Sequence, residues 1–347
     1  MRAITLKPGV KDSADLEEVP EPAESEGSIL VDGVALGICG TDAEIVHGDY
    51  GEAPPGSERL VLGHESLGRV AEAPSGSGFS AGDLVVGIVR RPDPVPCASC
   101  AAGEWDFCRN GRYTERGIKA LHGFGSERWR IEPEFAVKLD PALGSVGVLM
   151  EPTTVVAKAW EQIDRVLTRA TIGPERVLVT GAGPIGLLAA LLARQRGYDL
   201  TVLDRATGGP KPELVRDLGG TYHLGGVAEL DPPPDIIVEA TGASQVVLDA
   251  MSHTGANGVV CLTGISSGGH EIGIDAGDLN RMIVLENDLV FGSVNANRRH
   301  YEAAAEALAA ADRSWLERLI TRRVPLDRWR EALAREEDDI KVVVELG

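Results

Sequence analysis

The amino-acid sequence predicts an α/β protein with two domains, a mostly β domain and a domain built on a doubly wound parallel sheet. Three observations predict this organisation. The chain has 347 residues, and domains usually run to about 100–200 residues. Its first third carries short β-like runs separated by Gly, Pro and Asp turns. From about residue 151 onward, helix-like and strand-like segments alternate, which is typical of a parallel sheet.

The elements of the first domain are expected where apolar residues gather between turns. The N-terminal segment MRAITLKPGV reads as a first strand. Further β-like runs lie at 28–36, 67–73 and 84–89. In the second domain, helix-like periodicity and buried apolar runs predict helices and strands in alternation. The helices are expected at 155–167 and 185–196, and the strands at 176–180, 200–203, 236–239, 259–263 and 289–294.

The C-terminal tail combines both kinds of element. We expect a helix from 298 to 311, a turn at Pro325, a short helix at 329–335 and a final strand at 341–346. A strand here could return the tail to the first domain.

Charge and hydropathy exclude several classes of function. Asp and Glu number 53 against 34 Lys and Arg, which gives a net charge of -19. Such a surface repels polyphosphate backbones and anionic membranes, so no nucleic-acid partner is expected. No apolar stretch reaches the roughly 18 residues that a membrane helix needs. The N-terminus has no apolar run followed by a small-residue cleavage site, and we therefore expect a cytoplasmic protein.

A dinucleotide site is indicated by the segment after the strand at 176–180. Gly181, Gly183 and Gly186 form a GxGxxG motif, with Pro184 and Ile185 inside it, and an apolar helix follows at once. The glycines allow a tight turn, close approach of a pyrophosphate and close packing of the helix on the strand. The alternative is a glycine-rich turn in a nucleotide-free α/β fold.

The choice of coenzyme depends on the two residues that end the next strand. Asp204 lies about 20 residues after the motif, where an acid holds the ribose diol. A carboxylate there repels a 2′-phosphate, which favours NAD over NADP. Arg205 beside it could stack on adenine or pair with that phosphate. We therefore expect NAD, with NADP as a possible coenzyme.

A catalytic metal site is indicated by three separated segments. Cys39 lies in GICGTD, His64 and Glu65 lie in GHESLG, and Glu151 precedes a proline. Thiolate, imidazole and carboxylate form the ligand set of a catalytic zinc, with one position open for substrate. Cys39 alone would more often be a small buried hydrophobe, and His64 alone a satisfied loop histidine. Their joint placement in glycine-flanked turns favours the metal.

Four motifs carry a family resemblance. The runs GICGTDAEIV, LVLGHESLGRV, GAGPIG and VEATGA resemble the zinc-dependent medium-chain alcohol dehydrogenase family. The archaeal glucose (aldose) 1-dehydrogenase branch is more similar still, through RRPDPVPCASC, ERGIKALHGF, LMEPTTVVAKAWE and FGSVNANRRHY. The resemblance implies a GroES-like catalytic domain at 1–155 and 296–347 and an NAD(P)-binding Rossmann domain at 156–295. It also implies a homodimer or homotetramer.

The resemblance also implies roles for individual residues. Cys39, His64 and Glu151 would bind the catalytic zinc, Glu65 would be a ligand or its close catalytic neighbour, and Thr41 would pass the substrate proton into a relay. Sugar hydroxyls would contact Thr41, Glu115, Glu151 and Asn295. The coenzyme would contact Gly181, Gly183, Pro184, Ile185, Gly186, Asp204, Arg205, Thr241 and Asn295. Val89 and Val155 stand where some relatives carry polar sugar-binding residues.

A second cysteine cluster matches the structural-zinc lobe of that family. Cys97, Cys100 and Cys108 supply three thiolates, and Pro94 stands where a fourth cysteine would be expected. Asp93 is the nearest oxygen donor, and carboxylate is an accepted zinc ligand. The alternative is a lobe without metal that keeps reduced thiols. Cys261 lies in an apolar strand and is expected in the core.

For each of three polar residues near these motifs, the sequence leaves a functional role and a structural role open. Asp42 could serve the site or only cap local backbone amides. His122 could reach the sugar or be a turn histidine satisfied by backbone. Arg90 could bind coenzyme phosphate or a substrate oxygen, or be a salt-bridge partner at the domain joint.

Together the motifs predict an NAD(P)-dependent and zinc-dependent aldose 1-dehydrogenase. It would oxidise the C1 hydroxyl of a glucose- or galactose-type sugar to the lactone. A polyol or secondary-alcohol dehydrogenase with the same chemistry is the nearest alternative. A catalytically silent dinucleotide-binding protein is the alternative from another class.

Overall fold

The computed structural model describes residues 1–171, 173–266 and 271–347. The chain divides into two compact units. Unit 1 comprises Met1–Thr154 and Asn295–Gly347, and unit 2 comprises Val155–Val294. The boundaries expected from the sequence, 155/156 and 295/296, differ from these by one residue each.

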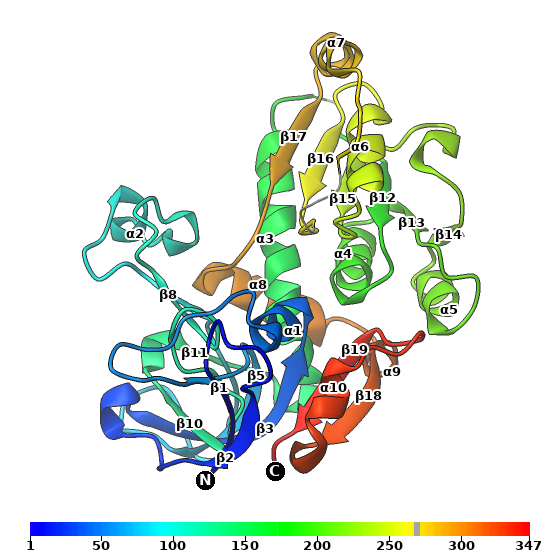
Figure 1. The fold of residues 1–347 in the computed structure, drawn as a ribbon. Coiled ribbons are helices and arrows are strands. Elements are labelled where there is room, and N and C mark those ends of the chain that lie inside the picture. The colour runs from blue at the N-terminus through cyan, green and yellow to red at the C-terminus, as the bar shows by residue number, and fades with distance from the viewer. Residues whose placement is uncertain (172, 267–270) are drawn as a thin grey trace. The chain divides into compact units, whose positions relative to one another are not determined.

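Unit 2 is built on a six-stranded parallel sheet (Figure 1). The strand order is β14-β13-β12-β15-β16-β17, so the chain starts in the middle, moves to one edge and then returns to fill the other half. A ligand in such a sheet binds beyond the carboxyl ends of the strands at this reversal of order. The strands are β12 (Arg176–Thr180), β13 (Asp199–Leu203), β14 (Thr221–His223), β15 (Ile236–Glu239), β16 (Val259–Leu262) and β17 (Leu289–Gly292).

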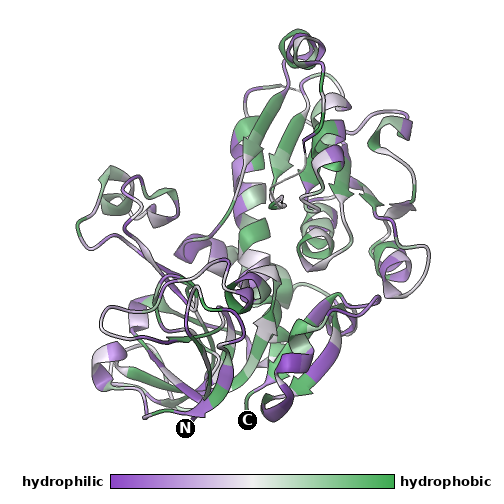
Figure 2. Cartoon of the chain, viewed as in Figure 1, coloured by the Kyte–Doolittle hydropathy of each residue, from purple (hydrophilic) through white to green (hydrophobic). Residues whose placement is uncertain are grey.

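Helices alternate with these strands, as predicted. The chain enters unit 2 along α3 (Met150–Leu167), and four further helices follow: α4 (Pro184–Gln195), α5 (Pro210–Asp217), α6 (Ser244–Ser252) and α7 (Ala276–Glu286). The eight residues 186–193 of α4 are all buried. The strands of the sheet are hydrophobic along most of their length (Figure 2), because both faces of a parallel sheet are covered. The sequence analysis missed β14, whose three residues are too few to show a period.

Unit 1 contains a seven-stranded, largely antiparallel sheet. Six strands follow the order β11-β6-β5-β3-β19-β18, and β10 also pairs with β3. Their bounds are β3 (Ile29–Ile38), β5 (Glu65–Glu72), β6 (Leu84–Gly87), β10 (Arg128–Ile131), β11 (Ala136–Lys138), β18 (Ile320–Pro325) and β19 (Lys341–Glu345). A second sheet joins β1 (Arg2–Leu6), β2 (Asp15–Glu18) and β4 (Leu60–Val61), and the short helix α1 (Gly40–His47) follows β3.

The C-terminal tail rejoins unit 1 through β19. This strand pairs antiparallel with β3 and parallel with β18. The tail also forms α8 (Arg298–Ala309), α9 (Arg313–Leu319) and α10 (Arg330–Leu333). The sequence analysis missed α9 and β18, because a seven-residue helix and a strand rich in Thr and Arg carry little hydrophobic periodicity.

A lobe of unit 1 stands away from its main sheet (Figure 1). It holds α2 (Ala98–Ala101) and leads into a small sheet of β7 (Arg90–Arg91), β8 (Thr114–Arg116) and β9 (Ala120–Leu121). The core of unit 1 lies elsewhere, where Ile4, Leu36, Trp129 and Val344 pack together. Each fully buried side chain of this kind stabilises the fold by about 1.5–3 kcal/mol.

Among the described residues, no helix combines the length and the apolar composition that crossing a bilayer requires.

Candidate active site

Three of the predicted metal ligands meet at one end of the unit 1 sheet. Cys39 follows β3, and His64 and Glu65 lie at the start of β5, whose register sets Glu65 opposite Gly37. The ligand atoms of Cys39, His64 and Glu65 all lie within 4.8 Å of one another. Cys39 Sγ is 3.2 Å from His64 Nε2. Strand pairing therefore assembles residues that are 25 positions apart in sequence.

Asp42 orients both the cysteine and the histidine. Its Oδ2 accepts a hydrogen bond of 2.9 Å from the backbone N–H of Cys39, which caps α1. Its Oδ1 lies 3.4 Å from Nδ1 of His64. Nε2 of His64 is consequently the nitrogen turned toward the thiol, the arrangement of a metal-binding imidazole whose other nitrogen faces a carboxylate. Asp42 thus caps backbone, as one sequence interpretation expects, and it also faces His64.

Glu65 is held by a buried lysine. Its Oε1 accepts a hydrogen bond of 2.5 Å from Nζ of Lys341, which also donates to the carbonyl oxygen of Ile38 at 3.0 Å. Both side chains are almost fully buried. A Cβ atom at Gly37 would overlap Oε2 of Glu65, so only glycine leaves room for the carboxylate. The three adjacent strands β5, β3 and β19 place this ion pair beside Cys39.

The charge balance of this group fits a divalent cation. Burial raises the pKa of the Cys39 thiol. Burial also raises the pKa of Glu151 to about 7, with Glu65 adding to the effect. Burial alone would lower the pKa of His64, but Cys39 and Asp42 outweigh it and raise that pKa well above its ordinary value. Acidic groups gathered in a dry place favour a bound cation, which would hold the thiol as thiolate.

Two predicted site residues lie near this group without joining it. Glu151, near the start of α3, interacts electrostatically with His64 and Glu65, but its carboxylate is not among the atoms gathered within 4.8 Å. Thr41 lies in the first turn of α1 and is partly buried. The gathered set therefore contains Glu65 where the resemblance implied Glu151 as the firmer ligand.

Glu115 and Asn295, the predicted sugar-binding pair, are hydrogen-bonded to each other. Nδ2 of Asn295 donates to Oε1 of Glu115 at 2.6 Å. Arg90 is buried, stacks on the ring of Tyr113 at 3.6 Å and donates to the same oxygen through Nε and Nη2. Arg90 therefore forms a salt bridge with Glu115 inside unit 1. Asn295 has a left-handed backbone with φ of 68°, a conformation that asparagine tolerates.

The cysteine lobe brings three thiols together but leaves Asp93 outside. Cys97, Cys100 and Cys108 lie within 4.8 Å of one another. The expectation that Asp93 completes the set is not met. Its carboxylate accepts hydrogen bonds of 2.8 Å from the backbone of Val95 and from Asn110, and it pairs with Arg112 at 3.4 Å. These partners hold the carboxylate on the flanking loop.

Two thiols of the lobe have shifted acidity. Backbone N–H groups of Arg109 and Cys100 lower the pKa of Cys97 to about 6. Burial raises the pKa of Cys100 to about 11. Cys97 is therefore the thiol of this pair that ionises first. Cys261 is fully buried in β16, as predicted.

The glycine-rich loop of unit 2 has the geometry of a phosphate cradle. Gly181 has φ of 89°, which L side chains rarely adopt, and a Cβ at Gly186 would overlap the carbonyl oxygen of Gly181. A Cβ at Gly183 would meet nothing within 4 Å, which leaves this backbone open to a ligand. Pro184 and Ile185 begin α4, whose N-terminus offers amide donors to an anion.

Thr241 borders this loop and is fixed by a buried acid. Glu239 ends β15 with no exposure to solvent. Its Oε1 accepts from the Thr241 backbone at 2.7 Å and from the Thr241 hydroxyl, and also from Thr180 at 3.2 Å. A Cβ at Gly181 would lie 2.9 Å from the Thr241 methyl group, so the two turns are in contact.

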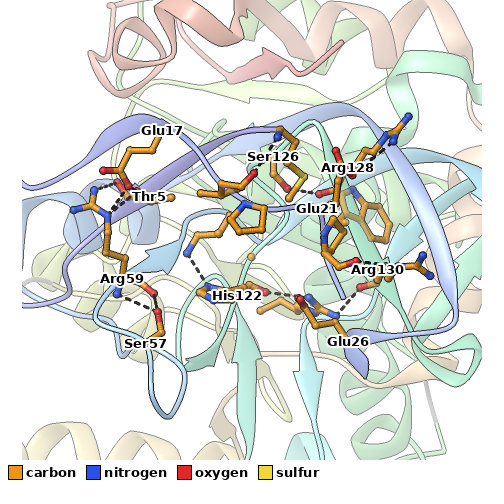
Figure 3. Close-up of a pocket in the computed structure, with 18 residues that line it drawn as sticks. Thr5, Glu17, Glu21, Glu26, Ser57, Arg59, His122, Ser126, Arg128 and Arg130 are labelled. Atoms are coloured by element: carbon orange, nitrogen blue, oxygen red, sulfur yellow. Dashed lines mark hydrogen bonds and ion pairs between the residues drawn. The ribbon is translucent and has the colours of Figure 1, made fainter. Parts of the chain in front are cut away.

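A separate hollow of about 280 Å³ lies in unit 1 and takes in His122 (Figure 3). Nδ1 of His122 accepts a hydrogen bond of 3.1 Å from the backbone of Val61. Arg59 on the same wall is paired with Glu17 at 2.7 Å. His122 is therefore the turn histidine satisfied by backbone, and its pocket is formed by other residues than the Cys39 group.

Comparisons with known proteins agree with this geometry. The family described as "Glucose dehydrogenase C-terminus" matches residues 144–346, and the family described as "Alcohol dehydrogenase GroES-like domain" matches residues 25–141. A glucose 1-dehydrogenase of Methanocella arvoryzae is 40% identical over 100% of both chains. This chain belongs to the glucose dehydrogenase family. The predicted resemblance and the fold of a GroES-like and a Rossmann domain are thereby confirmed.

Other family members show the same extent of similarity. The glucose 1-dehydrogenase of Thermoproteus tenax is 41% identical over 100% of this chain and 99% of its own. A solved structure of Haloferax mediterranei glucose dehydrogenase, in complex with NADP, Zn and gluconolactone, superimposes with a TM-score of 0.91. It is 31% identical, and the match covers 100% of this chain and 99% of that one.

Three residues that pair with predicted site residues escaped the sequence analysis: Lys341, Glu239 and Lys211. Lys341 could have been suspected, because it opens the strand KVVVE, in which three apolar residues follow it. Glu239 ends a buried strand, where an acid without water nearby needs several donors. Lys211, whose Nζ lies 3.4 Å from Oδ2 of Asp204, carries no local signal, because only the fold brings the two side chains together.

Proposed function

We propose that this protein oxidises the C1 hydroxyl of an aldose of the glucose or galactose type to the lactone, with hydride transfer to NAD(P). The observation that carries the proposal is the buried group of Cys39, His64 and Glu65, whose donor atoms lie within 4.8 Å of one another. Family membership supports the choice of an aldose, since the relatives are glucose 1-dehydrogenases.

Cys39 and His64 would hold a zinc ion together with Glu65 or Glu151. When bound, the zinc supplies Lewis-acid polarisation of the C1 oxygen, and the coenzyme supplies the hydride acceptor. Asp42 keeps Nε2 of His64 free for the metal, and Lys341 holds Glu65. Thr41, in the same turn of α1, would receive the proton that leaves the hydroxyl.

Glu115 and Asn295 would select a polyhydroxylated substrate. Arg90 and Asn295 both bind Oε1 of Glu115, and this fixes the carboxylate in one orientation. A fixed acceptor of this kind binds sugar hydroxyls and leaves short alcohols without a partner. The buried side chain of Val89 offers no hydrogen bond to the sugar, which supports tolerance at one hydroxyl.

The proposal is tested by measuring the substrate preference and the zinc content of the same protein. Purified protein should contain zinc and oxidise glucose or galactose with NAD or NADP, and it should be far less active on sorbitol or short alcohols. His64→Ala should lose activity and catalytic zinc while still binding coenzyme, which belongs to unit 2. His47→Ala is the matched control, because His47 is exposed and bonds only the backbone of its own helix at 3.1 Å.

The results separate the alternatives. Preference for sorbitol or a simple secondary alcohol would replace the aldose with the polyol alternative. Coenzyme binding without turnover of any of these substrates, or without zinc, would favour a silent dinucleotide-binding protein.

In the lobe, Cys97, Cys100 and Cys108 would bind a second zinc, with a donor other than Asp93 in the fourth position. Three thiolates are a common part of structural zinc sites. Two zinc ions per chain at saturation support this site, and one contradicts it.

Association into a homodimer or homotetramer would use unit 2. Exposed apolar side chains gather on and around α7 and the edge strand β17, with Val284 at 63%, Leu285 at 64% and Val294 at 57% exposure. Exposed apolar surface beside a strand edge favours pairing with another chain. Light scattering after gel filtration measures the mass directly.

A further inference from the structure

The hollow of about 280 Å³ in unit 1 has no part in the proposed reaction (Figure 3). Its volume is near the lower end of the range for small-molecule sites, so a small metabolite would fill it. Among the described residues, its wall carries four arginines and three glutamates. They are Arg59, Arg116, Arg128, Arg130, Glu17, Glu21 and Glu26. This positive balance is opposite to the net charge of -19 of the whole chain, and it favours an anionic ligand.

His122 lines the hollow and keeps one ring N–H available. Its Nδ1 accepts a hydrogen bond of 3.1 Å from the backbone N–H of Val61, so the proton of the neutral ring is on Nε2. Burial lowers the pKa of His122 and keeps the ring neutral, while Glu26 raises this pKa and Arg116 lowers it. Nε2 bonds to no described residue, and it can therefore donate to a ligand.

Two arginines of the wall keep nitrogens without a partner. Arg130 donates through Nε to the carbonyl oxygen of Pro22 at 3.1 Å and through Nη1 to that of Gly27 at 3.4 Å. Its Nη2 bonds to no residue of the described ranges, and no carboxylate in them forms an ion pair with it. Arg116 is almost fully buried, and its Nε has no partner in the described part of the chain. Cations with unused donors favour an anion beside them.

The glutamates of the wall supply acceptors for hydroxyl groups. Oε1 of Glu26 accepts a hydrogen bond of 3.0 Å from the backbone of Ala23, and its Oε2 accepts none from a described residue. Glu21 lies 3.6 Å from Nη1 of Arg128, which is longer than a hydrogen bond. These carboxylates repel a simple anion but accept hydrogen bonds from hydroxyl groups. The wall therefore fits an anion that also carries hydroxyl groups.

Figure 3 shows Arg59 with Glu17 at one end of the hollow, Arg130 with Glu26 at the other, and His122 between them. Arg59 is paired with Glu17 at 2.7 Å, so the cation without an acid partner is at the Arg130 end. We propose that this hollow binds a small polyhydroxylated anion, a sugar acid or a sugar phosphate. Its charged group would lie between Arg130 and His122, and a hydroxyl group would donate to Glu26. The site shares no residue with the proposed metal site.

Calorimetric titration of the purified protein tests this site with two probes. Gluconate and glucose 6-phosphate carry similar hydroxyl groups and different anionic groups. We expect one or both to bind at least about tenfold more tightly than acetate, which has no hydroxyl group, and sorbitol, which has no charge. The tighter probe identifies the charged group as carboxylate or phosphate. If neither probe binds more tightly than acetate and sorbitol, the inference is wrong.

Two substitutions locate the bound anion. His122→Asn keeps an acceptor for the N–H of Val61 and removes the Nε2 donor, so the affinity for the tighter probe should fall about tenfold or more. Arg130→Met keeps the stem, removes the charge and should weaken binding by a similar factor of about ten. Arg328→Met is the matched control, because this side chain is 61% exposed and pairs with Glu331. It should change the affinity by less than about twofold.

A third substitution separates recognition from a structural role. Glu26→Gln keeps an oxygen for the N–H of Ala23 and removes the charge that repels simple anions. The preference for the tighter probe over acetate should therefore fall about threefold or more. An unchanged preference would show that Glu26 does not face the ligand and would overturn the assigned contacts. If Arg130→Met lowers the melting temperature strongly, His122→Asn decides, because it preserves the bond to Val61.

Glu115→Gln separates this site from the proposed dehydrogenase site. It alters a predicted sugar-binding residue that does not line the hollow, and it should leave the affinity for the tighter probe within about twofold. If Glu115→Gln weakens the probe while His122→Asn and Arg130→Met do not, the anion occupies the dehydrogenase site. That result would overturn the inference and leave the proposed function standing.

Discussion

Glu65 illustrates how single residues at the metal site depend on one another. Its carboxylate fits only because residue 37 is a glycine, and the buried Lys341 donates a hydrogen bond to it. Burial lowers the pKa of Lys341, but Glu65 and Cys39 outweigh burial and raise it. The lysine therefore holds its proton and donates it to the Glu65 carboxylate in a hydrogen bond.

At this scale we predict strong coupling between Lys341 and Glu65. Lys341→Met should lower the free energy of unfolding by about 3–5 kcal/mol, because it leaves a buried charge without a partner. Adding Glu65→Gln should restore much of that stability, since a neutral pair no longer needs compensation. Denaturant unfolding of the metal-free single and double variants measures the coupling.

Lys7 gives the comparison for an exposed pair. It bonds Glu58 at 3.1 Å, and Glu58 is 85% exposed. Lys7→Met should change the free energy of unfolding by less than about 1 kcal/mol. A coupling between Lys341 and Glu65 as small as this would show that the buried pair does not fix the carboxylate.

At the scale of elements, the turn between β12 and α4 is the part of unit 2 that its glycines shape most. Gly186 lets α4 pack against the turn, and Gly183 leaves backbone open. The two glycines therefore fail in different ways when a methyl group is added, although both belong to one motif.

We predict that Gly186→Ala damages the fold and Gly183→Ala damages binding. The first places a Cβ on the carbonyl oxygen of Gly181 and should lower stability by about 1–3 kcal/mol. The second meets nothing within 4 Å and should keep the melting temperature, but it should weaken NADPH binding about tenfold or more. Thermal unfolding and fluorescence titration measure the two effects. The same loss of stability in both variants would contradict the assignment.

At the same scale, the cysteine lobe allows a prediction about the reactivity of its thiols. Because the pKa of Cys97 is about 6 and that of Cys100 about 11, Cys97 should be alkylated first in metal-free protein. Only the thiolate reacts. The rate of alkylation at Cys97 should therefore rise between pH 5 and pH 7 and level off above pH 7, because most of the change in thiolate fraction falls within about one pH unit of the pKa.

Mass spectrometry after timed treatment with iodoacetamide gives the order of modification. Zinc should protect all three thiols of the lobe. Faster reaction at Cys100 would contradict the order of acidity, and no protection by zinc would show that the lobe binds no metal through these residues.

At the scale of the whole molecule, the net charge of -19 governs the response to salt. Like charges repel one another in dilute buffer, and the Debye length shrinks to about 3 Å at 1 M salt. Local ion pairs such as the one between Lys7 and Glu58 lose little, because exposed pairs contribute little at any salt concentration.

We therefore predict that the melting temperature rises between dilute buffer and molar NaCl. Calorimetry across a salt series measures it, with sucrose at matched osmolality as the control for exclusion effects. A flat or falling melting temperature would show that self-repulsion does not limit stability.

The sequence by itself determined the strands of unit 2 other than β14, the helices α3 and α4, the glycine-rich loop, and the candidates Cys39, His64 and Glu65. Short-range patterns carry this information, because apolar periodicity and glycine spacing act within a few residues. Elements of three to seven residues, such as β14 and α9, lie below the length at which periodicity shows.

Only the tertiary structure decided which charges meet. Lys341 reaches Glu65 because β19 pairs with β3, and Lys211 reaches Asp204 because α5 turns back to the end of β13. Asp93 was expected to bind metal together with the cysteines, yet its carboxylate pairs with Asn110 and Arg112. An electrostatic partner is set by distance in space, and the sequence encodes that distance only through the packing of whole elements.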